Sequence, residues 1–149
     1  MKERIFLNKL VNVDISLILK KLIPVLKSRE KVVGAYLFGS ILGQCRPDSD
    51  IDVGLLLAPG VTYSEKEVEK IQTDILEELP PFKNHPFDLV ILNNSSAIFA
   101  YRVISQGRLI YASDHEAVTD FKEIVSRQRA ENYPRYRRAL EAICKGVQE

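Results

Sequence analysis

Residues 32–40, Val-Val-Gly-Ala-Tyr-Leu-Phe-Gly-Ser, and residues 50–52, Asp-Ile-Asp, form the most informative stretch of this sequence. The seven residues before the Gly-Ser pair are almost continuously apolar and rich in strand formers, which is typical of a buried strand. A polar, turn-rich segment over 43–49 leads to a second apolar strand, which we expect over residues 50–57. The polar residues of this region therefore gather between two buried strands.

Helix and strand signals surround this stretch. Apolar residues recur at helical spacing over residues 14–27, with Asp14 as N-cap, and Pro24 is expected to kink or shorten this helix. Ser64 and Glu67 form a capping box for a second helix. The remaining signals predict a strand over 87–92, a helix capped by Asn94 or Ser95 and ending at Gly107, a strand over 108–112, and a tail that Tyr133-Pro134 breaks into two helices.

This order of elements predicts an α+β (mixed α/β) fold, in which a small sheet is flanked by helices and followed by a C-terminal helical tail. The 149 residues are enough for one domain with a hydrophobic core. We therefore expect a single domain over residues 1–149. Its core would span about residues 30–115 and its helical tail about residues 116–149.

The charge balance of the chain bears on its partners. Lys and Arg number 21 and Asp and Glu number 20, which gives a formal net charge of +1. Proteins that bind nucleic acid through its phosphates usually carry a basic excess, so the composition disfavours direct nucleic-acid binding. No apolar run reaches the roughly 18 residues of a membrane span, and the first ten residues lack an apolar export segment. We therefore expect a cytoplasmic protein with no membrane partner.

Cysteine and histidine are sparse. Cys45 and Cys144 lie outside any CxxC or Cys/His pattern, which disfavours a zinc site. We expect two free thiols, with one disulfide as the alternative. His85 and His115 have no neighbours at ligand spacing and are expected at the surface or in turns.

Two acidic residues open the second strand. Side chains alternate along a strand, so Asp50 and Asp52 share one face, with their Cα atoms roughly 7 Å apart. Two carboxylates on an otherwise apolar strand are costly unless a cation neutralises them. Mg²⁺ suits this role because it binds one or two carboxylates, some waters and phosphate oxygens.

Asp88 is the third acidic residue, and its neighbours in the strand over residues 87–92 are all apolar. If this strand lies beside that of Asp50 and Asp52, three acids converge, as in a two-metal centre for in-line phosphoryl transfer. One ion would hold the triphosphate, and the other would lower the pKa of the attacking hydroxyl. Asp88 would be both a ligand and a proton acceptor. The alternative for Asp88 is a buried carboxylate satisfied by a backbone N–H or an Arg.

The candidate nucleotide-binding residues are Gly39, Ser40, Arg46 and Ser49. A glycine directly after a buried strand lets the backbone approach a phosphate, and the Ser40 hydroxyl can donate to a phosphate oxygen. A helical turn beginning at Ile41 would also favour an anion. Arg46 has two open interpretations, a phosphate or partner contact and a solvated loop residue, whereas the turn position of Ser49 favours shaping the loop.

These motifs resemble the DNA polymerase beta-like nucleotidyltransferase superfamily, whose signature is Gly-Ser, a spacer, Asp-x-Asp and a later strand-borne Asp. The chain resembles the minimal nucleotidyltransferase (MNT) branch in its short length, in residues 46–52 and in residues 102–111, with Gly-Arg-Leu-Ile-Tyr over 107–111. The resemblance covers about residues 30–115 and is strongest over 36–57. One difference is that residues 39–43 lack the Arg of the Gly-Ser-x-Ala-Arg-Gly found in many relatives and are one residue shorter.

The resemblance implies a Mg²⁺-dependent nucleotidyltransferase that moves AMP from ATP to a protein hydroxyl. The implied partner is a HEPN-family ribonuclease toxin, which the MNT protein AMPylates and neutralises as an antitoxin. One alternative is a non-catalytic antitoxin that occludes its toxin, in keeping with the shortened Gly-Ser loop. Another is a small-molecule nucleotidyltransferase of the aminoglycoside type, for which the tail after Asp114 is short.

The tail interleaves arginine with tyrosine, as listed here: Arg127, Arg129, Tyr133, Arg135, Tyr136, Arg137 and Arg138. One interpretation is a surface for a partner protein or RNA, with a toxin the better candidate. The other, which the nearby Glu123, Glu131 and Glu141 favour, is a helix with a charged outer face.

Overall fold

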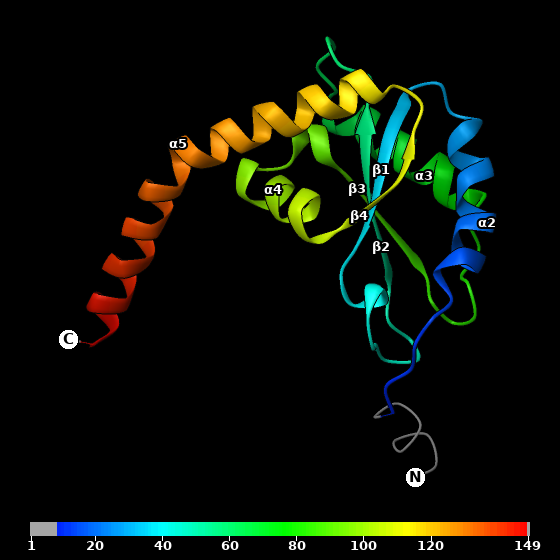
Figure 1. Cartoon of the computed structure of the whole chain (residues 1–149), viewed down its shortest axis with the longest axis horizontal. Helices are drawn as coiled ribbons and strands as arrows, with labels where there is room; N and C mark the ends of the chain where they lie inside the picture. The colour runs from blue at the N-terminus through cyan, green and yellow to red at the C-terminus, as the bar shows by residue number, and fades with distance from the viewer. Residues whose placement is uncertain (1–8, 149) are drawn as a thin grey trace.

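The computed structural model describes residues 9–148 and contains one four-stranded sheet flanked by helices (Figure 1). The strands are β1 (Val32–Phe38), β2 (Ile51–Leu57), β3 (Phe87–Ile91) and β4 (Arg108–Ala112). The helices are α2 (Ile15–Lys27), α3 (Glu65–Glu77), α4 (Ala97–Gln106) and α5 (His115–Gln148), with short 3₁₀ turns η1 (Ser40–Leu42) and η2 (Leu92–Asn94). The predicted α+β fold is confirmed. Residues 1–8, on which the expectation about an export segment rests, lie outside the described part.

The strand order in the sheet is β3-β2-β1-β4. β1 pairs antiparallel with both β2 and β4, whereas β2 pairs parallel with β3. The two strands that flank the Gly-Ser segment are therefore central and neighbouring. The start of β2, the start of β3 and the end of β1 consequently meet at one end of the sheet.

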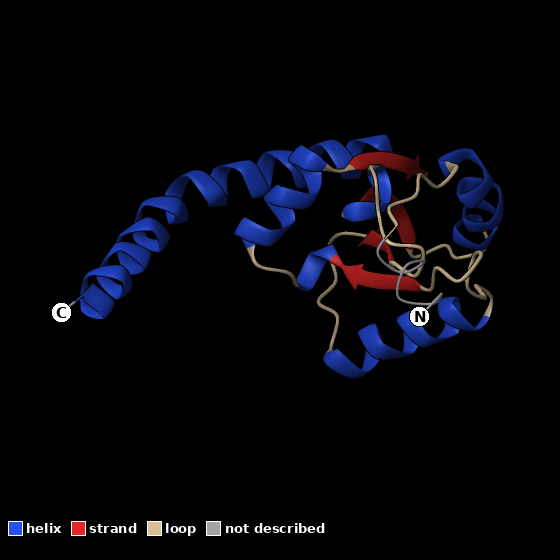
Figure 2. Ribbon diagram, turned by 90° about the horizontal axis from the view of Figure 1, so that it is seen from below, coloured by secondary structure: helices blue, strands red, loops and turns tan. Residues whose placement is uncertain are grey.

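The two faces of the sheet pack against different helices (Figure 2). On one face, Ile18, Leu22 and Leu26 of α2 and Ile75 of α3 are fully buried against the sheet. On the other face, Tyr36 of β1 packs with residues of α4, and the first turns of α5 cover Val33 and Leu56. Burial of this apolar surface is the main favourable term in the stability of the fold.

Side-chain caps begin three helices. The side chain of Asp14 accepts a hydrogen bond from Ser16 N at 3.0 Å, and that of Ser64 accepts from Glu67 N at 3.2 Å, so both predicted caps are confirmed. The cap of α4 is Ser96 rather than Asn94 or Ser95. The reason is that η2 occupies residues 92–94 and the Ser95 hydroxyl donates instead to Ile91 O at 3.0 Å.

The prediction of a break at Tyr133-Pro134 is wrong, because α5 runs without interruption from His115 to Gln148. Proline removes one backbone donor and crowds the carbonyl of the preceding turn. Residues 130–138 are all exposed, so water can hydrogen-bond to the freed carbonyl. Figure 1 shows that α5 bends part-way along its length, as proline-containing helices commonly do. Pro24 likewise lies inside α2, which still reaches Lys27.

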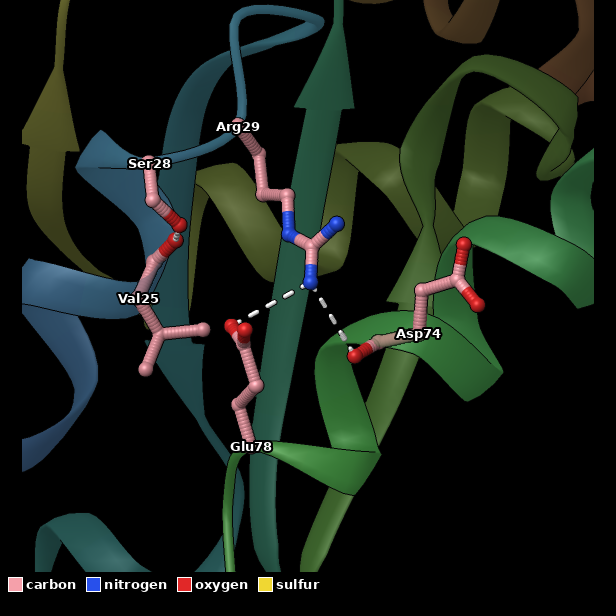
Figure 3. A network of polar contacts seen from close by, with 5 residues as sticks. All are labelled: Val25, Ser28, Arg29, Asp74 and Glu78. Carbon is pink, nitrogen blue, oxygen red and sulfur yellow. Dashed lines mark hydrogen bonds and ion pairs between the residues drawn. The ribbon is translucent and has the colours of Figure 1, made fainter.

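A polar network ties the loop before β1 to α3 (Figure 3). Arg29 Nη2 donates to the carbonyl of Asp74 at 3.2 Å and pairs with Glu78 Oε2 at 3.2 Å. The Ser28 hydroxyl donates to Val25 O at 2.6 Å in the same loop. A pocket of about 520 Å³ opens beside Arg29, at the opposite end of β1 from Gly39. This network therefore joins the loop before β1 to α3 at the end of the sheet opposite Asp50, Asp52 and Asp88.

Both cysteines within the described residues are free, Cys45 buried and Cys144 exposed, as expected. No helix in residues 9–148 combines the length and apolar character needed to cross a bilayer.

Candidate metal and nucleotide site

Three carboxylates converge where β2 and β3 begin. Asp52 and Asp88 are register partners in the parallel pairing of the two strands, and Asp50 directly precedes β2. Oxygen atoms of Asp50, Asp52 and Asp88 all lie within 4.8 Å of one another. The expectation that the two strands are neighbours is confirmed, and the three acids are brought together by backbone pairing.

The alternation of side chains along β2 explains why the acids point away from the core. Ile51 and Val53 are fully buried, so Asp52 between them faces the other side of the sheet. Asp52 is half-buried, while Asp50 and Asp88 are exposed. The site is therefore open to solvent on one side. The alternative in which Asp88 is a buried carboxylate with a hydrogen-bond or Arg partner is wrong, because Asp88 is exposed. A pocket of about 310 Å³ lies beside Asp88, between β3 and α3.

The electrostatics of the cluster favour a bound cation. Burial, together with the like charges of Asp88 and Asp50, raises the pKa of Asp52 from 3.8 to about 6. No Lys or Arg in the described part of the chain forms an ion pair with any of the three acids. Three carboxylates sharing one site repel one another unless a positive charge lies among them. Their hard oxygen donors suit Mg²⁺.

Gly39 is required where it stands. Its backbone has φ +84° and ψ −164°, a conformation that residues other than glycine rarely adopt. A Cβ at this position would also collide with Asp52 Oδ2. The backbone at Gly39 therefore lies against the Asp52 carboxylate. The two are neighbours because Phe38, the last residue of β1, pairs with Asp52 of β2.

The segment after Gly39 forms a single 3₁₀ turn. Leu42 N donates to Gly39 O at 3.3 Å and Gly43 N donates to Ser40 O at 3.1 Å. The turn begins at Ser40, one residue earlier than predicted. The first N–H groups of a helical turn have no partner inside it, so they are available to an anion. The exposed Ser40 opens this turn and directly follows Gly39, whose backbone lies against Asp52.

Arg46 and Ser49 shape the loop that leads to Asp50. The Ser49 hydroxyl accepts from Arg46 N at 2.9 Å, which is the turn-shaping contact that its position favoured. Arg46 Nε pairs with Asp48 Oδ1 at 3.4 Å, with both side chains exposed. Among the described residues, Gly39 and Ser40 therefore adjoin the acids, whereas Arg46 and Ser49 support the loop.

His85 is a residue that sequence reasoning missed. It is only 4% exposed, so it does not lie at the surface, and its backbone pairs with Phe82 to close the turn over residues 83–84, in keeping with the other part of the expectation. Its Nδ1 lies 2.7 Å from Ser49 O, and a carbonyl only accepts, so Nδ1 carries a proton and donates it. This bond and Ile51 N to Pro86 O at 2.8 Å fasten the loop before Asp50 to the segment before Asp88. His115 is exposed, as predicted.

Residues 20–116, more than half of the chain, match the family model described as polymerase beta, nucleotidyltransferase. The chain belongs to this nucleotidyltransferase family. The match spans β1, β2, β3 and β4, and so includes Gly39, Ser40 and all three acids. The domain is therefore a nucleotidyltransferase domain that carries its acidic triad.

Solved structures share this nucleotidyltransferase fold. A crystal structure of the MntA–HepT toxin–antitoxin contains a chain 21% identical to this one, with a TM-score of 0.58 and coverage of 90% of this chain and 99% of that one. A tri-AMPylated Shewanella oneidensis HEPN toxin in complex with MNT antitoxin gives 21% identity, a TM-score of 0.58, and coverage of 90% and 98%. A crystal structure of a toxin–antitoxin with AMP-PNP contains a chain that is 22% identical to this one. Its TM-score is 0.59, and the match covers 88% of this chain and 98% of that one. No curated protein sequence matches significantly.

Proposed function

We propose that this chain is a Mg²⁺-dependent adenylyltransferase that transfers AMP from ATP to a hydroxyl group of a HEPN-family toxin, and thereby acts as its antitoxin. The observation that carries the proposal is the convergence of Asp50, Asp52 and Asp88 within 4.8 Å beside the Gly39–Ser40 turn. An acidic triad beside a turn with free backbone N–H groups is the arrangement that phosphoryl-transfer chemistry needs.

The acidic triad would hold the metal, with Asp50, Asp52 and Asp88 as ligands of two ions. When bound, Mg²⁺ supplies the positive charge that offsets the charge of the triphosphate and its transition state. The raised pKa of Asp52 and the lack of an ion-pairing Lys or Arg among residues 9–148 support this assignment.

The remaining residues orient the nucleotide and move a proton. The N–H groups of the η1 turn and the Ser40 hydroxyl donate hydrogen bonds to phosphate oxygens. The acceptor hydroxyl oxygen forms a bond to the α-phosphorus, and the bond from that phosphorus to the bridging oxygen breaks, so that pyrophosphate leaves. The exposed Asp88 carboxylate accepts the proton of the acceptor hydroxyl. Arg46 and Ser49 keep the loop before Asp50 in place and are candidates for secondary phosphate contacts.

The choice of acceptor rests on structural relatives. Chains with this fold occur in complexes with HEPN-type toxins, one of which is tri-AMPylated, and another relative was solved with AMP-PNP. An exposed acidic triad suits an acceptor presented by a separate protein, because the described residues leave Asp50 and Asp88 open to solvent.

The position of the label in ATP tests the proposal. The chain is incubated with Mg²⁺, its proposed HEPN-family partner, and ATP labelled at either the α- or the γ-phosphate. The proposal predicts that α-label moves to the HEPN protein and γ-label does not. Transfer of γ-label would indicate a kinase, and stable binding of the HEPN protein without transfer of α-label would indicate an antitoxin that acts by occlusion.

A further inference from the structure

One face of α5 changes from buried to exposed along its length. In its first turns, Ala117, Val118 and Val125 are buried, and Phe121 between them packs against both apolar clusters of the sheet face. These residues recur at spacings of three and four, so they form one stripe along the helix. This part of the stripe docks α5 onto the sheet.

The same stripe continues beyond the body of the protein. Its next apolar members are exposed: Tyr133 by 37%, Tyr136 by 42%, Leu140 by 45% and Ile143 by 64%. Their spacings of three, four and three residues are those of the a and d positions of a coiled coil. Figure 1 shows this half of α5 extending away from the sheet and α4. Single exposed apolar residues need no explanation, but four in register along one helix face form a seam for another helix.

Arg129 marks the point at which the stripe leaves the body. Its guanidinium lies over the ring of Tyr101 of α4, 4.6 Å from the centroid, and over the ring of Tyr133, 4.3 Å from the centroid. The buried and exposed parts of the stripe are thus continuous through one cation–π stack. The exposed seam is an extension of an existing helix-packing face, with Tyr133 held in place at its start.

The positive charge around the seam indicates which kind of partner it can bind. Residues 127–145 carry six Lys or Arg and two Glu, a net charge of +4, while the chain as a whole carries +1. The rest of the chain is therefore about −3. Two copies of a +4 segment repel each other, which disfavours a homodimer through this face. An RNA surface would need aromatic and basic groups but not the aliphatic side chains of Leu140 and Ile143.

We propose that the C-terminal half of α5 docks an α-helix of a partner protein, whose own apolar stripe is flanked by Asp and Glu. Tyr133, Tyr136, Leu140 and Ile143 pack into that stripe. Arg137, which follows Tyr136 beside the seam and pairs with Glu141 at 3.4 Å in the free chain, turns to its acidic flank. The inference goes beyond the reaction at the triad, since it concerns a separate surface and needs no nucleotide.

A pair of synthetic helical peptides tests this surface. Both have three heptads with Leu at a and d, and they differ in carrying Glu or Lys at e and g. Binding to the full chain is measured by fluorescence anisotropy for the wild type, Leu140→Glu, and the control Ala142→Glu, which adds the same charge to the opposite face. All substituted positions are exposed, so we expect each variant to fold, and circular dichroism checks this. Ile143→Glu provides a second variant of the seam.

The proposal predicts that the Glu peptide binds the wild type at least about tenfold more tightly than the Lys peptide, because its flanks are complementary. Leu140→Glu and Ile143→Glu each weaken binding about tenfold, and Ala142→Glu changes it less than about twofold. Equal binding of both peptides, no binding of the Glu peptide, or equal loss in Ala142→Glu would overturn the proposal. Tighter binding of a uridine oligonucleotide than of the Glu peptide would overturn it in favour of RNA. None of these outcomes bears on AMP transfer.

Discussion

Asp52 and Asp88 are direct partners across the parallel pairing of β2 and β3. Their separation is therefore fixed by the hydrogen bonds of the sheet and not by a flexible loop. Gly39 closes the same corner, because its backbone lies against the Asp52 carboxylate. The proposed metal site and the proposed phosphate-binding turn are thus two parts of one structure, and each can be tested separately.

Replacing any one of the three acids by its amide should abolish nucleotidyl transfer. Asp50→Asn, Asp52→Asn and Asp88→Asn each remove a proposed metal ligand with little change in volume, and we expect activity to fall about a thousandfold or more. Transfer is measured as α-label on the acceptor. Asp48→Asn is the matched control, since Asp48 is an exposed acid of the same loop that pairs with Arg46. Activity lost equally in Asp48→Asn would argue for a general effect of loop charge.

The stability of the metal-free protein should depend on the titration of Asp52. Its folded-state pKa of about 6 exceeds its ordinary value of 3.8, so between these pH values the folded protein holds a proton that the unfolded chain releases. This contribution is fully present below about pH 4 and is lost as the pH rises through 6. The Tm of the wild type relative to Asp52→Asn should therefore fall between pH 5 and pH 7 in EDTA.

Mg²⁺ should reverse that loss. A bound cation favours ionised Asp52, so millimolar Mg²⁺ is expected to raise the Tm of the wild type more at pH 7 than at pH 5. Asp52→Asn should show a much smaller increase at both pH values. A Mg²⁺ effect that is independent of pH and of Asp52 would place the cation elsewhere.

Most elements could be predicted because their signals are local. The apolar runs of β1 and β3 and the caps Asp14 and Ser64 act within a few residues, and the structure follows them closely. The convergence of Asp88 with Asp52 was conditional on strand order, which becomes definite only when β2 and β3 pair.

Two features could not be predicted, for different reasons. The bond between His85 and Ser49 O joins residues 36 positions apart, and no local pattern indicates such a contact. Pro134 usually ends a helix, but that local rule assumes that the freed carbonyl has no other partner. In the exposed part of α5 water is available, so the helix continues.

Gly39→Ala should impair the site more than the fold. An added Cβ collides with Asp52 Oδ2 at a position whose φ is +84°, so we expect a large loss of Mg²⁺ affinity and of transfer. Gly60→Ala is the matched control, because Gly60 has φ +86° but nothing within 4 Å of an added Cβ. Backbone strain destabilises both variants, and at Gly39, whose ψ of −164° lies in a region that is essentially limited to glycine, it costs about 1–3 kcal/mol. Comparable Mg²⁺ binding in the two variants, measured by calorimetry, would remove the proposed role of the Gly39 contact.

His85 should act as a positioning residue for Asp50. His85→Leu leaves Ser49 O without its donor at a part-buried position, which costs about 1 kcal/mol or more and loosens the loop before Asp50. We expect the Mg²⁺ concentration for half-maximal activity to rise, with activity largely restored at saturating Mg²⁺. His85→Asn, whose amide can donate from a similar place, should recover much of the affinity. His115→Leu, at an exposed position, should behave as the wild type. A fall in kcat alone in His85→Leu would contradict this assignment.

The proposed reaction is tested most directly by the intact mass of the proposed HEPN-family partner after incubation with this chain, ATP and Mg²⁺. The control is the Asp50→Ala, Asp52→Ala double variant, which keeps the fold but lacks two carboxylates of the triad. The account predicts that the partner gains AMP-sized increments only with the unaltered chain. If the partner binds but its mass never changes with any of the four nucleoside triphosphates, the nucleotidyltransferase fold serves binding alone and the account is wrong.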